Sequence, residues 1–154
     1  MSDPLVFQMG EFPAELPVEL LYASNHMWAQ RREDVYRFGF TAYAVRLLQD
    51  VYFLDWNFDA GVTLQHQQEL GSIESKKAES SLYAPIGGTL TILNEQLMTD
   101  PSGINLDKYG DGWLFEICPA DDNTTADLMT AQEYMLHLED VWKITQRTIK
   151  GQLG

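Results

Sequence analysis

The sequence has little cysteine and little basic charge. Its 154 residues include one cysteine, Cys118, and ten Lys or Arg side chains against 23 Asp or Glu, which gives a formal net charge of −13. A single cysteine excludes a disulfide within the chain. A strongly acidic surface repels nucleic acid and anionic membranes but attracts basic proteins. We therefore expect no nucleic-acid or membrane partner, and a function that involves docking onto other proteins.

Long apolar runs are also missing. No segment approaches the length of a membrane span. The first residues, MSDPLVFQMGEFPAELP, have neither the basic nor the apolar region of a secretory signal. The sequence thus predicts a soluble, cytoplasmic protein. Its length and its 45% hydrophobic content suit one domain with a substantial core.

Conventional catalytic motifs are absent from the sequence. His26, His66 and His137 do not have metal-ligand spacing, and Cys118 lies in an apolar strand pattern without a base nearby in the sequence. We interpret all four as structural residues. The glycines of YGDGW (109–113) and IGG (86–88) lack a phosphate-loop pattern and predict turns. No nucleophile comes with its own base, so we expect a protein that is not an enzyme and holds no metal.

Residue patterns divide the chain into three zones. Residues 1–17 hold three of the six prolines, which predicts an extended arm rather than a regular element. Residues 18–120 contain many short stretches rich in β-branched and aromatic residues, which predict a small β sandwich or barrel. Residues 121–154 have helical patterns and are predicted to pack on the β domain. We expect one domain overall.

Two helices are specified by local signals. TAYAVRLLQD (41–50) predicts a short internal helix with Thr41 as its N-cap. TAQE (130–133) has the spacing of a capping box and predicts a longer helix that runs toward Lys150. The apolar stripe of that helix consists of Tyr134, Met135, Leu138, Val141, Trp142 and Ile149.

A basic dipeptide, Lys76-Lys77, lies between two stretches that resemble strands, at the predicted tip of a hairpin. A lysine in such a turn is usually only solvated charge. Here Glu74 precedes Lys77 by three residues, Gly61 precedes it by sixteen, and Gly88 follows it by eleven. These spacings are similar to those around the modified lysine of lipoyl-bearing proteins.

The similarity extends over most of the chain. ESKKAESSLYAPIGGTLTILNEQLMTDPSGIN (74–105) with YGDGWLFEI (109–117) resembles the lipoylation segment, asparagine-bearing loop and glycine–tryptophan strand of the glycine cleavage H protein family. LLYASNHMW (20–28) and FGFTAYAVRLLQDVYFLDW (38–56) resemble the upstream motifs of the same family, and DLMTAQEYMLHLED (127–140) resembles its final helices. The resemblance covers roughly residues 20–140, and its motifs follow one another in the same register as in the family.

The resemblance implies a fold and a cofactor. The expected fold is a barrel-sandwich hybrid of two small antiparallel sheets, with a short internal helix and C-terminal helices. Lys77 is expected to carry lipoate in amide linkage, with Glu74, Gly61 and Gly88 as the context of lipoylation. A lipoate-attaching enzyme and a dihydrolipoamide dehydrogenase are the implied partners. A biotinyl carrier is the other tethered-cofactor alternative, but the two methionines that usually flank its lysine are missing.

Two positions depart from the family pattern. Met27 and Ser81 stand where the family has carboxylates that stabilise a cationic aminomethyl cargo, and with His26 they are our candidates for the cargo cleft. We interpret this loss, together with the C-terminal extension VWKITQRTIKGQLG, as similar to the H-like lipoate-binding proteins of heterodisulfide-reductase-like sulfur oxidation. The cargo would then be a sulfur intermediate and the partner a heterodisulfide-reductase-like complex.

The sequence leaves two alternatives open. If the two departures are sequence drift, the chain is a classical H protein that shuttles an aminomethyl group between glycine decarboxylase and aminomethyltransferase. If the fold is kept without the cofactor, it is an unmodified binding or regulatory protein. The presence of Glu74, Lys77, Gly61 and Gly88 argues against the unmodified protein.

Overall fold

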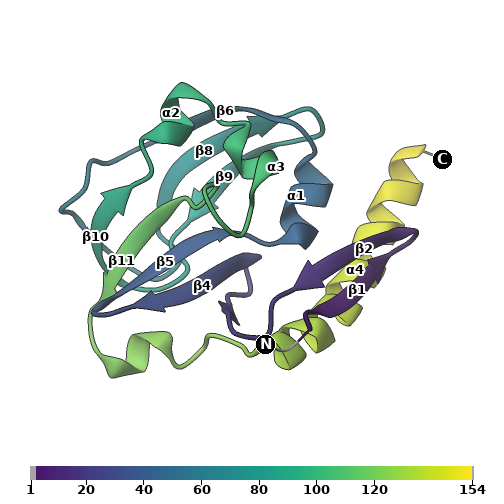
Figure 1. Cartoon of the computed structure of the whole chain (residues 1–154). Helices are drawn as coiled ribbons and strands as arrows, with labels where there is room; N and C mark the ends of the chain where they lie inside the picture. Colours follow the sequence, from purple (N-terminus) through teal and green to yellow (C-terminus); the bar gives the residue numbers. More distant parts are fainter. Residues whose placement is uncertain (1–2, 154) are drawn as a thin grey trace.

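Short strands with alternating apolar residues pair into antiparallel sheets, two of which form the main body of the described structure (Figure 1). The computed structural model describes the backbone of residues 3–153 and the side chains of residues 3–146. The three-stranded sheet has the order β6 (Val51–Trp56), β8 (Glu69–Ser75), β9 (Glu79–Tyr83). The larger, six-stranded sheet has the order β3 (Leu21–Tyr22), β4 (Met27–Arg32), β5 (Val35–Phe40), β11 (Phe115–Pro119), β10 (Gly88–Leu93), β7 (Thr63–Leu64).

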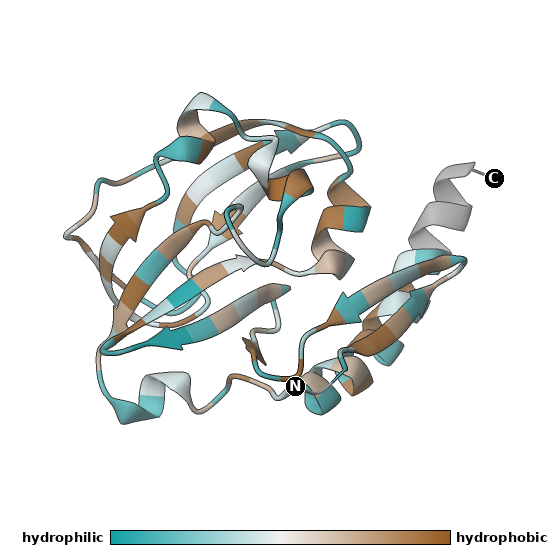
Figure 2. Cartoon of the chain, in the orientation of Figure 1, coloured by the Kyte–Doolittle hydropathy of each residue, from teal (hydrophilic) through white to brown (hydrophobic). Residues whose placement is uncertain are grey.

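The main core is formed by the inward-facing residues of both sheets. Phe38 and Phe115 of the six-stranded sheet, whose ring centroids lie 5.6 Å apart, belong to one apolar cluster with Ile73 and Leu82 of the three-stranded sheet. Apolar and polar residues alternate along several of these strands, such as β8, and those strands bury one face (Figure 2). β4 instead buries both faces, with Met27 and Ala29 in the main core and Trp28 in the second core described below. The prediction of a mainly β protein is confirmed.

The predicted internal helix is α1 (Ala42–Leu48), which connects β5 to β6. Thr41 caps it, since the Thr41 Oγ1 accepts a hydrogen bond from the backbone N–H of Ala44 at 3.3 Å. Two one-turn helices, α2 (Gln96–Thr99) and α3 (Gly103–Leu106), lie between β10 and β11.

The extended arm predicted for residues 1–17 is wrong. This segment is a hairpin of β1 (Leu5–Met9) and β2 (Phe12–Leu16), joined by a tight turn in which Gly10 has φ +65°. Prolines do not prevent it because a two-stranded sheet leaves one side of each strand unpaired. Pro13, opposite Gln8, is exposed on such a strand.

The long C-terminal helix begins at the predicted capping box. A 3₁₀ turn, η1 (Asp122–Thr125), precedes α4 (Ala131–Leu153). The Thr130 Oγ1 accepts from the Glu133 N–H at 3.2 Å, and the Glu133 Oε1 accepts from the Thr130 N–H at 2.8 Å. Ile149, which we expected in the apolar stripe, lies outside the described side chains.

The hairpin, α1 and α4 form a second apolar core beside the main one. Phe7 of β1 packs edge-on against Tyr43 of α1 and Trp142 of α4, with ring centroids 6.1 Å and 6.4 Å away. In Figure 1 the hairpin lies against α4, to one side of the two main sheets. The N-terminal segment and the C-terminal helix therefore stabilise each other.

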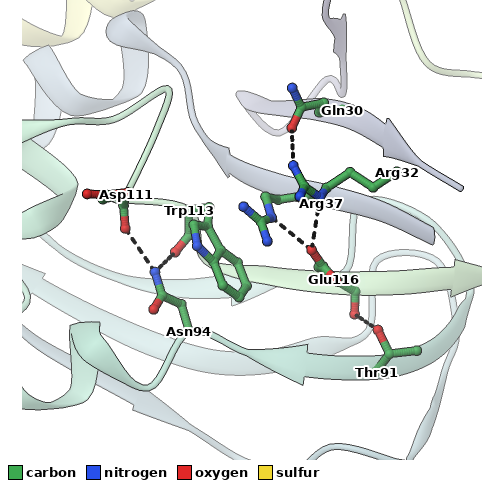
Figure 3. Close-up of polar contacts among 8 residues, drawn as sticks. All are labelled: Gln30, Arg32, Arg37, Thr91, Asn94, Asp111, Trp113 and Glu116. Atoms are coloured by element: carbon green, nitrogen blue, oxygen red, sulfur yellow. Dashed lines mark hydrogen bonds and ion pairs between the residues drawn. The ribbon is translucent and has the colours of Figure 1, made fainter.

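Two buried polar side chains fix the six-stranded sheet (Figure 3). The Asn94 Nδ2 donates to the backbone carbonyls of Asp111 and Trp113 at 3.0 Å and 2.7 Å, which holds the loop before β11. The Glu116 carboxylate accepts from the Arg37 Nε at 2.8 Å. Both groups are thus paired, as buried polar groups need to be.

In the part of the chain that the structure describes, no helix is long and apolar enough to cross a membrane. The cytoplasmic location expected from the sequence stays a prediction.

The second core gives a first testable prediction. Leu16→Ala removes a fully buried side chain of β2, so we expect the free energy of unfolding to fall by about 3 kcal/mol. Val6→Ala in the neighbouring strand β1, where the side chain is exposed, should change it by less than about 1 kcal/mol. Urea unfolding measures both values. Equal small losses would mean that the hairpin is not part of the folded core.

Candidate functional site: the lysine hairpin and a neighbouring cleft

Lys77 lies at the tip of the hairpin between β8 and β9, as the sequence predicted. The last ladder pair is Glu74 and Glu79. Beyond it, the Ser75 N–H donates to the Ala78 carbonyl at 2.8 Å, and the Ala78 N–H donates to the Ser75 Oγ at 3.1 Å. These two bonds close the turn and fix the backbone on both sides of the two lysines.

The hairpin tip is also tied to the rest of the molecule. The Lys76 N–H donates to the carbonyl of Asp50, in the connection between α1 and β6, at 2.9 Å. Both lysine side chains are exposed. Within the described residues, the recorded ion pairs join Arg32 and Arg37 to Glu116, and neither involves a hairpin lysine. The site therefore presents an accessible amine on a fixed base, which fits a tether for a covalent cofactor.

The glycines named from spacing lie outside this hairpin and shape the backbone elsewhere. Gly88 begins β10 with φ +149°, and a Cβ there would come within 2.1 Å of the Cys118 carbonyl oxygen. Gly61 has φ +105° in open surroundings, and its N–H donates to Leu90 O at 2.7 Å. Both positions need glycine for conformational reasons. Glu74, by contrast, belongs to the hairpin and faces outward from β8.

The three residues that we expected in a cargo cleft do lie together. His26, Met27 and Ser81 line one cavity of about 200 Å³ between the edge of β9 and α1. The remaining lining residues are Asn25, Phe40, Ala44, Leu47, Leu48, Ile73, Ser80, Leu82 and Tyr83.

This cleft has no charged wall. Its lining contains no Asp, Glu, Lys or Arg from the described part of the chain, and Glu79, which could have supplied a carboxylate, is not among the lining residues. Burial, followed by the nearby His137, lowers the pKa of His26 from 6.5 to about 4. His26 is therefore uncharged at neutral pH, and the cleft presents apolar surface and neutral polar groups.

A buried hydrogen-bond network holds His26 in place. Its Nδ1 shares a hydrogen bond with the Tyr134 hydroxyl of α4 at 2.8 Å, and that hydroxyl shares another with the Thr41 Oγ1 at 3.0 Å. Tyr134 stacks on Tyr22 with ring centroids 4.7 Å apart, and burial raises the pKa of the Tyr134 hydroxyl. The long helix thus orients the histidine wall of the cleft.

A second cavity, of about 300 Å³, was not predicted from the sequence. Ala23, Ser24, His66 and Gln67 are among its lining residues, and it shares Asn25 and Tyr83 with the first cavity.

Asn25 stands where the two cavities meet. Its Nδ2 donates to the Tyr83 carbonyl at 3.1 Å, whereas its Oδ1 is buried without a recorded partner among the described residues. A lone asparagine without a motif gave no signal that could have identified it.

The half-buried His26 makes stability depend on pH. Because the pKa of His26 is about 4 in the folded chain and near 6.5 when unfolded, the unfolded state binds more protons between these values. His26 should therefore cost about 3 kcal/mol of stability as pH falls from 6.5 to 4, and nothing further below that.

Unfolding in urea at pH 7 and at pH 4.5 tests this expectation against His26→Asn, which should lose less stability on acidification than the parent. His66→Asn, at an exposed position, is the control and should behave as the parent. Identical pH profiles for all three proteins would contradict the assignment.

The comparisons with known proteins agree with this architecture. The family model described as "Glycine cleavage H-protein" matches residues 20–141. A crystal structure of a glycine cleavage system H protein from Mycobacterium marinum superimposes with a TM-score of 0.68 at 32% identity, covering 77% of this chain and 95% of that one. This likeness confirms the barrel-sandwich fold that the sequence implied.

Curated relatives give the same result. A probable glycine cleavage system H protein of Natronomonas pharaonis is 40% identical over 120 residues, which is 78% of this chain and 94% of that protein. The glycine cleavage system H protein of Pseudoalteromonas translucida is 38% identical over 122 residues, 79% of this chain and 94% of its own length. The chain belongs to the glycine cleavage H-protein family.

Proposed function

We propose that Lys77 is the residue of this carrier protein that bears the lipoyl group. Members of the family are carriers with lipoate attached covalently to a lysine. The observation that supports Lys77 is its exposed position at the tip of a hairpin whose base is fixed by the bonds between Ser75 and Ala78. When bound, lipoate supplies a disulfide and dithiol couple to the enzymes that the carrier visits.

The residues of the hairpin expose and position the lysine that would carry the lipoyl group. The hairpin exposes the amine to solvent, and the Lys76–Asp50 backbone bond holds the tip against the connection between α1 and β6. Amide formation removes the positive charge of Lys77, so the modified carrier is more acidic than the unmodified chain. A tether on a docked carrier raises the local concentration of its cargo at the partner's active site.

Substitution of the two lysines tests the attachment site. Lys77→Arg should abolish lipoylation by a lipoate-attaching enzyme because arginine offers no acylable amine, whereas Lys76→Arg should still be modified. Intact mass measures both. Both substitutions keep the positive charge, so neither should alter stability. Modification of the Lys77→Arg chain would exclude this site.

For the cargo, we infer the classical aminomethyl group, passed between a glycine decarboxylase and an aminomethyltransferase. The relatives compared above are named for the glycine cleavage system, which favours this cargo over the sulfur intermediate expected from the sequence. A dihydrolipoamide dehydrogenase would then complete the cycle by reoxidising the arm.

One observation favours a second candidate cargo. Met27 and Ser81 leave the cleft without carboxylates, and His26 is neutral there. A cationic amine would enter this cleft without charge-assisted hydrogen bonds, whereas a neutral sulfur intermediate would need none. The sulfur-oxidation carrier and its heterodisulfide-reductase-like partner therefore stay as the second proposal.

Loading with glycine separates the two cargoes. If the cargo is aminomethyl, the lipoylated protein should gain the corresponding mass with glycine and a glycine decarboxylase. Ser81→Asp, which returns a carboxylate to the cleft, should slow loss of the loaded group about tenfold. A Mycobacterium marinum H protein is the positive control. Failure to load while the control loads would favour the sulfur cargo.

A further inference from the structure

An apolar surface lies beside the lysine hairpin. Tyr52 and Phe53 are adjacent residues of β6, and their side chains are 60% and 44% exposed, although neighbours in a strand normally point to opposite faces. A break in the register between Val51 and Phe53 explains this, since a bulge in β6 brings both aromatic side chains to the solvent side. Val51 and Leu54, on either side, are buried.

A third apolar side chain, Leu106 of α3, is 82% exposed, and the residue before it in the chain is bonded to the start of β6. The preceding residue, Asn105, fixes α3 against the start of β6. The Asn105 Oδ1 accepts from the Val51 N–H at 3.0 Å, and the Asn105 Nδ2 donates to the Gln49 carbonyl at 2.6 Å.

The hairpin tip also contacts the connection between α1 and β6, to which Asn105 is bonded. Besides the Lys76 bond to Asp50, Ser75 pairs with Val51 in the ladder of β6 and β8. We call Tyr52, Phe53 and Leu106 the tip patch.

Carboxylates surround the tip patch. Asp50 precedes β6, Asp55 follows Phe53 by two residues, Glu74 is the cross-strand partner of Phe53, and Glu79 pairs with Glu74. Asp50, Asp55 and Glu79 are exposed, and Glu74 is half-buried. Lys76 and Lys77 are the cations of the hairpin tip, and one of them loses its charge on acylation. Arg46 and Lys108 line a cavity with Asp50 and Asn105 next to this region. An apolar patch with an acidic rim fits a partner that has an apolar hollow bordered by Lys or Arg.

We propose that the tip patch is the docking surface for the lipoate-attaching enzyme. This proposal rests on the assignment of Lys77. Enzymes that act on the far end of the arm can work at a distance from the hairpin. The attaching enzyme, in contrast, must bring the Lys77 Nζ itself into its active site, so its surface necessarily covers the residues around the tip.

The acyl-transfer reaction also requires the attaching enzyme to dock close to Lys77. The uncharged Lys77 amine attacks the carbonyl carbon of an activated lipoyl group, such as an acyl adenylate. The carbon–nitrogen bond forms, the bond from that carbon to the phosphate oxygen of AMP breaks, and the amine proton passes to a base. The amine must therefore be held within contact of the activated carbonyl, which requires close docking beside the tip.

The test is the rate of lipoylation of purified unmodified protein by a lipoate–protein ligase with lipoate and ATP. Phe53→Ser and Leu106→Ser should each lower kcat/KM about tenfold, mainly through KM, because each removes an apolar contact. Ile92→Ser, an exposed apolar position on β10 of the other sheet, is the matched control and should leave kcat/KM unchanged. Raised salt should increase KM for the parent protein.

Each variant is then lipoylated to completion and reduced by dihydrolipoamide dehydrogenase with NADH, which supplies the two electrons for the disulfide. Parental reduction rates, together with unchanged thermal midpoints, support the docking assignment. Normal lipoylation of Phe53→Ser and Leu106→Ser would overturn it, and so would an equal loss in both assays, since another partner would then use the patch. If the parent protein is not lipoylated on Lys77, the proposed function itself fails.

Discussion

The closure of the β8–β9 hairpin is the constraint on which the candidate site depends. The bonds between Ser75 and Ala78 complete the ladder, and the bond from Lys76 to Asp50 prevents the tip from moving independently of α1 and β6. Through the same connection, Asn105 fixes α3. One hydrogen-bonded junction therefore positions the lysine, the bulged aromatic residues of β6 and the exposed end of α3 relative to one another.

Much of this architecture could be predicted from the sequence because the signals are local. Thr41 and the capping box at Thr130 form the bonds that their spacing indicated, and Lys77 lies in the turn where the flanking strand patterns placed it. The N-terminal segment carries two conflicting signals. Its prolines indicate an extended arm, whereas Phe7, Met9, Ala14 and Leu16 alternate with polar or exposed positions around a glycine turn, as in the hairpin that forms. That alternation was the signal that could have found it.

The cleft depends on contacts between segments far apart in the chain, and local sequence patterns do not predict such contacts. The grouping of His26, Met27 and Ser81 came from a family resemblance, and the structure brings the three together. The second cavity, the orphaned Asn25 Oδ1 and the depressed pKa of His26 depend on packing between segments far apart in the chain, including α4. Local patterns carry no information on such contacts, which is also why the bulge at Tyr52 was not expected.

The second apolar core has a consequence for any truncation of this chain. The family match covers residues 20–141, yet Phe7 and Trp142, on opposite sides of that range, meet over Tyr43. The two extensions shield the same aromatic side of the shared fold, so loss of either one would expose apolar surface on the other.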